Sequence, residues 1–227
     1  MSLPKDIAVL IPAHNEQATV ATVVAAVRRV FPGEIVVIDD ASTDATVAVA
    51  RQSGATVLPL PLRLGAWGAL QTGMRYALSR RLQGALTMDA DGQHSAFDLA
   101  AVWQPVAESR ADVVIGAYPQ RASWARRLAW QLFRRLTKLT VRDITSGFRA
   151  YNHRALAVLA APGASLLDYQ DVGVLLLLRQ AGLHTAEVPV TMNPRQAGHS
   201  RVFSSWMVVA RYMLHTLVLC VARGVRP

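Results

Sequence analysis

The chain has a single cysteine, Cys220, among its 227 residues, so a disulfide within the chain is impossible. Cysteine usage therefore gives no indication of an oxidising compartment. The first six residues, MSLPKD, lack the basic and then apolar pattern of a secretory signal peptide. We expect a cytoplasmic protein. Its 52% of hydrophobic residues is enough for one substantial core, which favours one domain over two.

Several catalytic signatures are also missing. The sequence contains no GxGxxG, HExxH or GxSxG, which argues against dinucleotide-dependent dehydrogenases, zinc metalloproteases and serine hydrolases. Gly68 and Gly73 have the spacing of a P-loop, but Met74 and Arg75 follow where a P-loop needs lysine and a hydroxyl residue. No repeat, low-complexity tract or long linker is visible.

Positive charge is scarce in the first half of the chain and abundant in the second. Residues 1–118 hold 9 Lys/Arg and 11 Asp/Glu, a net of −2, whereas residues 119–227 hold 15 and 4, a net of +11. The basic half indicates an anionic membrane surface or a phosphorylated substrate, with scattered solubilising arginines as the alternative. No recognisable basic-aromatic module is present, so we expect no nucleic-acid partner.

Short apolar runs alternate with helical patterns along the first half. The runs cover residues 7–11, 35–38, 56–60, 85–88 and 113–115, and the helical patterns cover 16–30, 43–52, 67–81 and 97–107. This alternation predicts an α/β fold with a mostly parallel central sheet and helices on both faces. Ligands in such folds bind at the carboxyl ends of the strands, so the residues after each run are the candidates for a site.

Acidic clusters follow three of these runs. They are Pro12-Ala13-His14-Asn15-Glu16, Asp39-Asp40-Ala41-Ser42-Thr43-Asp44 and Asp89-Ala90-Asp91-Gly92-Gln93. Carboxylates from three strands would meet at one sheet edge, which is unfavourable unless something positive is bound there. If Asp89 and Asp91 lie in an extended segment, both carboxylates face one cation, and Gln93 adds a carbonyl oxygen. Such ligands predict Mg²⁺ or Mn²⁺. A helix cap with a solvated turn is the alternative.

The other two clusters have both functional and structural interpretations. One carboxylate of Asp39-Asp40 would face a ribose or a base edge, while Ser42 or Thr43 caps the next helix. Glu16 is either a ligand contact or a first-turn acid that interacts with a helix dipole.

Six segments in this order resemble one family. They are IPAHNE at 11–16, VIDDASTDAT at 37–46, LGAWGALQTGMRYAL at 64–78, MDADGQH at 88–94, DITSGFRAY at 143–151 and VPVTMNPRQAGHSRV at 188–202. Together they are similar to the inverting GT-A glycosyltransferases that include dolichol-phosphate mannose synthase and polyprenyl-phosphate sugar transferases. The resemblance implies a GT-A (Rossmann-like) fold, a nucleotide-sugar donor, a divalent metal and a polyprenyl monophosphate acceptor.

The resemblance also implies a role for each matching position. The nucleotide-sugar set is Pro12, His14, Glu16, Asp39, Asp40, Ser42 and Asp89, and the metal set is Asp89, Asp91 and Gln93. The acceptor-phosphate set is Ser146, Arg149, Arg195, Ser200 and Arg201, and the catalytic candidates are Asp171 and Arg149. Two positions depart from the family: Ala66 and Trp67 replace a frequent Lys-Gly pair, and Gly173 replaces a frequent Glu.

Two acceptor classes and a non-enzymatic role stay open at this stage. A lipid monophosphate oxygen is already largely ionised, because phosphate monoesters have a second pKa of about 6, and needs no general base. A saccharide hydroxyl, as in polysaccharide assembly, would need Asp171 as a base. The departures at Ala66 and Gly173 also allow a catalytically impaired subunit that binds a nucleotide sugar for a membrane partner.

Two segments in the basic half are predicted to contact a membrane or a membrane-protein partner. Residues 121–139 form an amphipathic helical pattern, with arginines and a lysine on one arc and leucines on the other. Residues 202–222 are apolar but interrupted by Arg211, which favours an interfacial helix over a spanning one. We therefore expect a glycosyltransferase domain over 1–202 and an interfacial helix over 203–227. Packing of both helices on the protein core is the alternative.

We predict that the protein floats with anionic vesicles at low salt and is partly released at high salt. Salt shortens the Debye length from about 10 Å at 0.1 M to about 3 Å at 1 M, which weakens electrostatic attachment but not apolar insertion. Deletion of 203–227 should give fuller release from a folded protein. Flotation with neutral vesicles is the control, and full-length protein left at the bottom of the gradient with anionic lipid contradicts the prediction.

Overall fold

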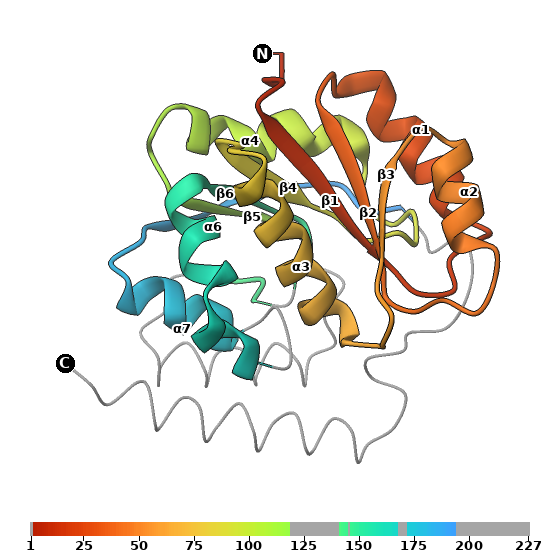
Figure 1. The fold of residues 1–227 in the computed structure, drawn as a ribbon. Coiled ribbons are helices and arrows are strands. Elements are labelled where there is room, and N and C mark those ends of the chain that lie inside the picture. Colours follow the sequence, from red (N-terminus) through yellow and green to blue (C-terminus); the bar gives the residue numbers. More distant parts are fainter. Residues whose placement is uncertain (1, 119–140, 145, 168–171, 194–227) are drawn as a thin grey trace, which may run out of the picture.

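The computed structural model describes residues 2–118, 141–144, 146–167 and 172–193 (Figure 1). The strands are β1 (Ile7–Ala13), β2 (Glu34–Asp39), β3 (Thr56–Pro59), β4 (Gly84–Thr87), β5 (Val113–Ala117), β6 (Arg149–Asn152) and β7 (Thr185–Pro189). The α-helices are α1 (Val20–Val30), α2 (Thr46–Gln52), α3 (Gly65–Ser79), α4 (Leu99–Ala107), α6 (His153–Ala160) and α7 (Val172–Gln180). Two 3-10 helices, η1 (Ala96–Asp98) and η3 (Pro162–Leu166), complete the described elements.

The seven strands form one sheet in the order β3-β2-β1-β4-β6-β5-β7. Neighbouring strands run parallel except at β6, which is antiparallel to both β4 and β5. Helices cover both faces: α3, α6 and α7 lie on one, and α1, α2 and α4 on the other (Figure 1). The predicted α/β fold with a mostly parallel sheet is confirmed.

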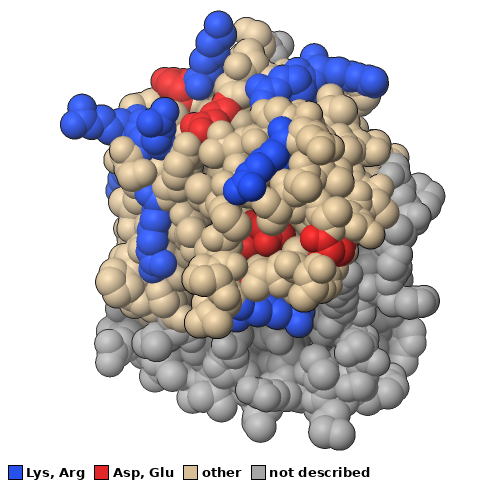
Figure 2. Space-filling model, turned by 45° about the vertical axis from the view of Figure 1, so that its right-hand side comes forward, with Lys and Arg blue, Asp and Glu red and all other residues tan. Residues whose placement is uncertain are grey.

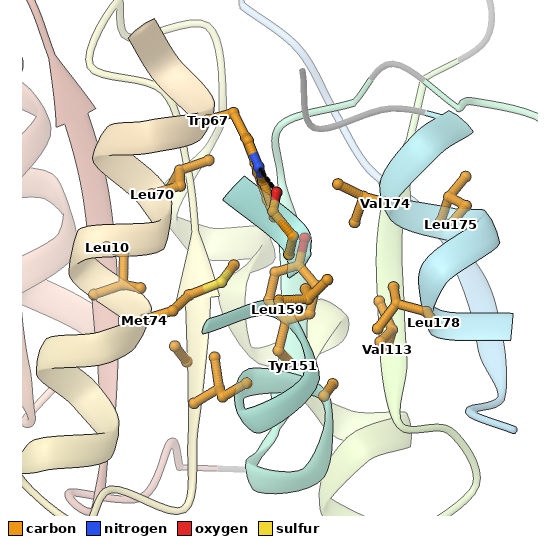
Figure 3. Close-up of a cluster of buried hydrophobic side chains, with 14 of the residues drawn as sticks. Leu10, Trp67, Leu70, Met74, Val113, Tyr151, Leu159, Val174, Leu175 and Leu178 are labelled. Atoms are coloured by element: carbon orange, nitrogen blue, oxygen red, sulfur yellow. Dashed lines mark hydrogen bonds between the residues drawn. The ribbon is translucent and has the colours of Figure 1, made fainter. Parts of the chain in front are cut away.

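Alternating side chains of the buried strands divide the core into two layers. In β1, Ala8 and Leu10 pack toward α3, while Ile7, Val9 and Ile11 pack toward α1. This is the period of two that a β-strand imposes. Figure 3 shows the first layer, where side chains of α3, α6 and α7 meet over β1, β5 and β6.

The four predicted helices exist, but three begin later than predicted, and two short strands were missed. α1 begins at Val20 rather than at residue 16, α2 at Thr46 rather than 43, and α4 at Leu99 after the 3-10 turn η1. The residues left out of the helices belong to the loops at the strand ends, where side chains fix the backbone. The missed strands β6 and β7 overlap the motif segments 143–151 and 188–202, and the helices α6 and α7 were not predicted either.

The described surface carries separate charged side chains rather than one continuous basic face in the view of Figure 2. Four of the basic residues after 118 are described, namely Arg142, Arg149, Arg154 and Arg179. None of the helices formed by the described residues combines the length and the apolar character that a membrane span requires. The predicted helices over 121–139 and 202–222, and the domain boundary at 202, lie outside the described residues and stay predictions.

Trp67, one of the departures from the family pattern, is a core residue here. Its side chain is 2% exposed, and its indole Nε1 donates to the carbonyl oxygen of Ala164 at 2.9 Å (Figure 3). Four residues further along α3, the Gln71 amide donates to the carbonyl oxygen of Leu159 at 2.7 Å. These bonds attach α3 to α6 and η3.

We predict that Trp67→Phe lowers the free energy of unfolding by about 1–3 kcal/mol more than Trp103→Phe does, because it leaves the buried Ala164 carbonyl without its donor. Trp103 is the matched control: it is 5% exposed, and its Nε1 is buried with no partner among the described residues. Urea denaturation measures both variants. Equal destabilisation would show that the Trp67 hydrogen bond does not hold these helices together.

Candidate functional site

The predicted acidic clusters meet at one edge of the sheet. The carboxyl ends of β1 and β2 are adjacent, with Ala13 paired to Asp39. β4 runs parallel to β1 on its other side and ends at Thr87. Because β6 is antiparallel, it begins at this same edge, where Arg149 pairs with Thr87. The sheet order therefore brings residues 146–149 beside the Asp89 cluster, a proximity that the sequence alone did not predict.

The loops after β1 and β2 are joined by reciprocal hydrogen bonds. The backbone N–H of Asn15 donates to the Ser42 hydroxyl at 2.9 Å, and the Asn15 side-chain oxygen accepts from the backbone N–H of Thr43 at 2.8 Å. The backbone N–H of Glu16 donates to the Thr46 hydroxyl at 2.8 Å. The two loops thus form one unit that positions both acidic clusters.

Asp44 holds the start of α2 within this unit. It accepts from the backbone N–H and the hydroxyl of Thr46 and from the backbone N–H of Gln17. Partial burial would raise the pKa of Asp44, but the hydrogen bonds from Thr46 and Gln17 outweigh it and lower this pKa from its usual value. The carboxylate therefore stays ionised across the neutral range.

Two structural interpretations of these loops are wrong. Neither Ser42 nor Thr43 caps α2. The Ser42 hydroxyl instead accepts from the backbone N–H of Asn15. Asp44 accepts from the backbone N–H of Thr46, the first residue of α2. Glu16 is not a first-turn acid, since α1 begins at Val20 and has no acidic residue in its first turn. Instead, its side chain accepts from the Thr19 hydroxyl at 3.0 Å. The nucleotide-contact roles of Ser42 and Glu16 stay predictions.

Asp40 is bonded to the N-terminus of α3. Its two carboxylate oxygens accept from the backbone N–H groups of Leu64, at 2.6 Å, and of Gly65, at 3.0 Å. These are donors that a helix start leaves unpaired, and the helix dipole favours an anion there. His14 Nδ1 donates to the Asp40 backbone oxygen at 2.8 Å. Asp40 is 4% exposed and thus has a structural role, whether or not it also contacts a ligand.

Asp39 has a carboxylate oxygen that the described residues leave unpaired. Oδ2 accepts from the backbone N–H of Ser42 at 3.1 Å, whereas Oδ1 is buried with no partner among the described residues. A buried acceptor without a donor is unfavourable by about 1–3 kcal/mol or more, so this atom is suited to a ligand N–H or O–H. Pro12, half-buried at the end of β1, pairs with Ile38 of β2 nearby.

Asp89 and Asp91 follow β4, but not in an extended segment. The chain turns at Ala90 and Asp91, so the geometric premise of the predicted metal site is wrong. Asp91 is 8% exposed, and its Oδ1 accepts from the backbone N–H of Gln93 at 3.0 Å. The side chain of Asp89 is 47% exposed, and its Oδ2 lies 3.2 Å from His94 Nε2.

Asp89 and Asp91 are the carboxylates of the predicted metal set, and both are described. Among the described residues, no three His, Cys, Asp or Glu side chains gather closely enough to hold a metal ion by themselves. The metal assignment to Asp89, Asp91 and Gln93 stays a prediction.

Ser146 and Arg149, the predicted acceptor-phosphate contacts, are both buried. Their exposed fractions are 1% and 0%. The Ser146 hydroxyl donates to the carbonyl oxygen of Gly116 at 2.7 Å. The Arg149 guanidinium donates to the carbonyl oxygens of Ser146 and Ile144 at 2.7 and 2.9 Å. Both side chains therefore shape the segment before β6, and their contact with an acceptor stays a prediction.

Four other predicted site residues, Asp171, Arg195, Ser200 and Arg201, lie outside the described residues. Sequence reasoning missed His94, which bonds Asp89, and Gly147, which packs against the same carboxylate. Asp98 Oδ2 accepts from the backbone N–H and the hydroxyl of Thr191 at 2.8 and 2.7 Å, which joins η1 to the segment after β7. Of these residues, only His94 could have been found from the sequence, because it directly follows the acidic cluster 89–93.

Comparisons with known proteins agree with the resemblance. The family described as "Glycosyl transferase family 2" matches residues 8–159. The undecaprenyl-phosphate mannosyltransferase of Micrococcus luteus is 27% identical, over 85% of this chain and 86% of its own length. The polyprenol monophosphomannose synthase of Mycolicibacterium smegmatis is 26% identical, over 87% and 81%. The chain therefore belongs to glycosyl transferase family 2 and is a glycosyltransferase, as predicted.

A solved structure with a similar fold is glucosyl-3-phosphoglycerate synthase from Mycobacterium tuberculosis, in complex with Mn²⁺, uridine diphosphate and phosphoglyceric acid. It superposes with a TM-score of 0.74 at 21% identity, covering 97% of this chain and 79% of that one. At this identity the likeness shows the fold alone, and it confirms the predicted GT-A arrangement.

We predict that Asp40→Asn lowers the free energy of unfolding by about 0.5–2 kcal/mol, the usual loss for a removed helix cap. The amide keeps one acceptor but turns an N–H toward a backbone N–H. Asp6→Asn, at an exposed position, is the control and should stay within about 0.5 kcal/mol of wild type. Urea denaturation measures both. Unchanged stability with weakened nucleotide binding would make Asp40 a ligand contact rather than a cap.

Proposed function

We propose that this glycosyl transferase family 2 protein transfers a sugar from a nucleotide-sugar donor to a polyprenyl monophosphate, with inversion at the anomeric carbon. The proposed reaction takes place at the cytoplasmic face of a membrane to which the protein binds peripherally. The observation that carries the donor and metal part of the proposal is the sheet edge, where acidic residues following β1, β2 and β4 meet beside the start of β6.

The donor would lie along the loops after β1 and β2. The buried Asp39 Oδ1 is an acceptor suited to an N–H of the base or a hydroxyl of the ribose. Pro12 and His14, both half-buried, flank it on β1 and its loop. Because the hydrogen bonds between the two loops fix their shape in advance, donor binding would require little ordering of this part of the chain.

A divalent metal would be held by Asp89 and Asp91, with Gln93 as a further oxygen ligand. Mg²⁺ typically takes one or two carboxylates and completes its octahedral shell with water and substrate phosphates. The residues present fit that description: two carboxylates, one of them half exposed, and no third acidic ligand among the described residues. When bound, Mg²⁺ or Mn²⁺ supplies charge neutralisation for the leaving diphosphate. The similar solved structure contains Mn²⁺ and uridine diphosphate.

The transfer itself exchanges one C–O bond for another. An oxygen of the acceptor phosphate attacks the anomeric carbon while the bond from that carbon to the donor diphosphate breaks. The acceptor oxygen is already ionised at neutral pH, so no proton needs to be removed. Arg195, Ser200 and Arg201 would contact the phosphates, with Ser146 and Arg149 shaping the acceptor side. Asp171 would serve as a base only for a hydroxyl acceptor.

The acceptor class rests on the relatives rather than on the site. Two relatives that match over more than four fifths of this chain are named as an undecaprenyl-phosphate mannosyltransferase and a polyprenol monophosphomannose synthase. The similar solved structure instead contains phosphoglyceric acid, a small phosphorylated acid with a hydroxyl. That neighbour is the reason to include a hydroxyl acceptor in the test.

We predict that one nucleotide sugar, with Mn²⁺, stabilises the protein by about 2.7 kcal/mol at one hundred times its dissociation constant. Thermal shift with uridine- and guanosine-diphosphate sugars identifies it. With that donor, the protein should glycosylate polyprenyl monophosphate and not the matched polyprenol, and EDTA should abolish product formation.

Three results would contradict the proposal. Product formed on 3-phosphoglycerate or a saccharide but not on the lipid phosphate would establish a hydroxyl acceptor. Donor binding without product on any acceptor would indicate a nucleotide-sugar-binding subunit. Full activity in EDTA would show that the reaction does not require a divalent metal.

A further inference from the structure

We propose that His94 is a positioning residue that orients the Asp89 carboxylate toward the divalent metal. This inference rests on the metal site of the proposed function and adds a residue to it that does not itself touch metal or substrate. The role follows from the contacts of His94, its burial, and the way the fold fixes both sides of Asp89.

The imidazole of His94 faces the Asp89 carboxylate from inside the protein. His94 Nε2 lies 3.2 Å from Asp89 Oδ2. The His94 side chain is 1% exposed, whereas the Asp89 side chain is 47% exposed. The hydrogen bond therefore joins a rigid buried group to a carboxylate that extends toward solvent at the site edge. Such a bond selects one side-chain rotation of Asp89 before any ligand arrives.

The hydrogen-bond pattern assigns the tautomer of this histidine. An ionised carboxylate only accepts, so the hydrogen must reside on Nε2. Nδ1 is buried and has no partner among the described residues, and a hydrogen there would have no acceptor. The Nε2–H form is thus the one that the surroundings favour, and Asp89 is the only hydrogen-bond partner that the described residues offer to the imidazole ring.

His94 cannot easily move away from this contact. Its ring packs on Phe148, with centroids 5.0 Å apart and the planes inclined by 30°. Its backbone forms an antiparallel bridge with Met192, and next to it the Asn193 N–H donates to the carbonyl oxygen of Gln93 at 2.8 Å. The imidazole is therefore held from the side of β6 and from the segment after β7.

Gly147 confines the other oxygen of the same carboxylate. A Cβ atom at residue 147 would lie 2.7 Å from Asp89 Oδ1, closer than real contacts allow. The Thr87 hydroxyl donates to the carbonyl oxygen of Gly147 at 2.7 Å and keeps this backbone in place. Asp89 thus lies between a hydrogen-bond donor and a closely packed glycine, which leaves its carboxylate little rotational freedom.

Preorganised carboxylates bind metals more tightly, because the ligand geometry is set before the ion arrives. Removal of such a supporting hydrogen bond typically weakens metal affinity 10- to 100-fold. We expect a decrease of about that size for His94→Phe, which keeps a buried aromatic ring against Phe148 but has no donor. His94→Gln places an amide N–H near the position of Nε2 and should restore affinity to within about 3-fold of wild type.

The experiment titrates Mn²⁺ into wild type, His94→Phe, His94→Gln and Asp89→Asn, with the free ion followed by electron paramagnetic resonance. Uridine diphosphate and guanosine diphosphate are used in parallel. The affinity of each variant for the same nucleotides in EDTA is measured as well. The expected result is weakened Mn²⁺ binding in His94→Phe, near-normal binding in His94→Gln, and unchanged metal-free nucleotide affinity in both.

Each other outcome overturns a defined part of the inference. If Asp89→Asn loses Mn²⁺ and His94→Phe does not, His94 has no positioning role, while the metal site stands. If both His94 variants weaken Mn²⁺ binding equally, or metal-free nucleotide affinity falls by the same factor, the histidine is only a packing residue. If Asp89→Asn binds Mn²⁺ like wild type, the metal site of the proposed function is wrong. The positioning role of His94 is then wrong as well.

Discussion

The concentration of carboxylates at one edge of a buried sheet is the constraint on which the rest of the site depends. A carboxylate that loses water must gain donors, and four of the aspartates here, Asp91 among them, obtain them from nearby backbone N–H groups. Asp40 accepts from the backbone N–H groups at the start of α3. Asp44 accepts from the backbone N–H groups of Gln17 and Thr46, and Asp39 accepts from that of Ser42. These bonds determine where the helices begin and how the loops lie.

The antiparallel strand β6 explains how two distant segments come to share the site. Because β6 enters the sheet between β4 and β5, its first residue lies at the edge where the parallel strands end. Gly147 is thereby placed against Asp89, and Phe148 against His94. Ser146, which precedes β6, and Arg149, the first residue of β6, are both buried, and their bonds to backbone carbonyls hold the shape of the segment that leads into this strand.

The two layers of the core support this arrangement from opposite faces. On one face, α3 is attached to α6 and η3 through Trp67 and Gln71, which both donate to backbone carbonyls. Trp67, which departs from the pattern that the family resemblance implied, is therefore used for packing. On the other face, α1 and α4 pack over the alternate side chains of the same strands. Rigid layers on both sides keep the strand ends in register.

The sequence by itself determined the fold class, because apolar runs that alternate with helical patterns have few solutions other than a covered parallel sheet. It also identified the acidic clusters, since those residues follow the strands directly. Only the tertiary structure decided what each carboxylate contacts. Asp40 caps a helix 24 residues away, and Asp89 faces a histidine whose ring is held by Phe148, far along the chain. Such contacts depend on strand order and loop shape, which local sequence patterns do not encode.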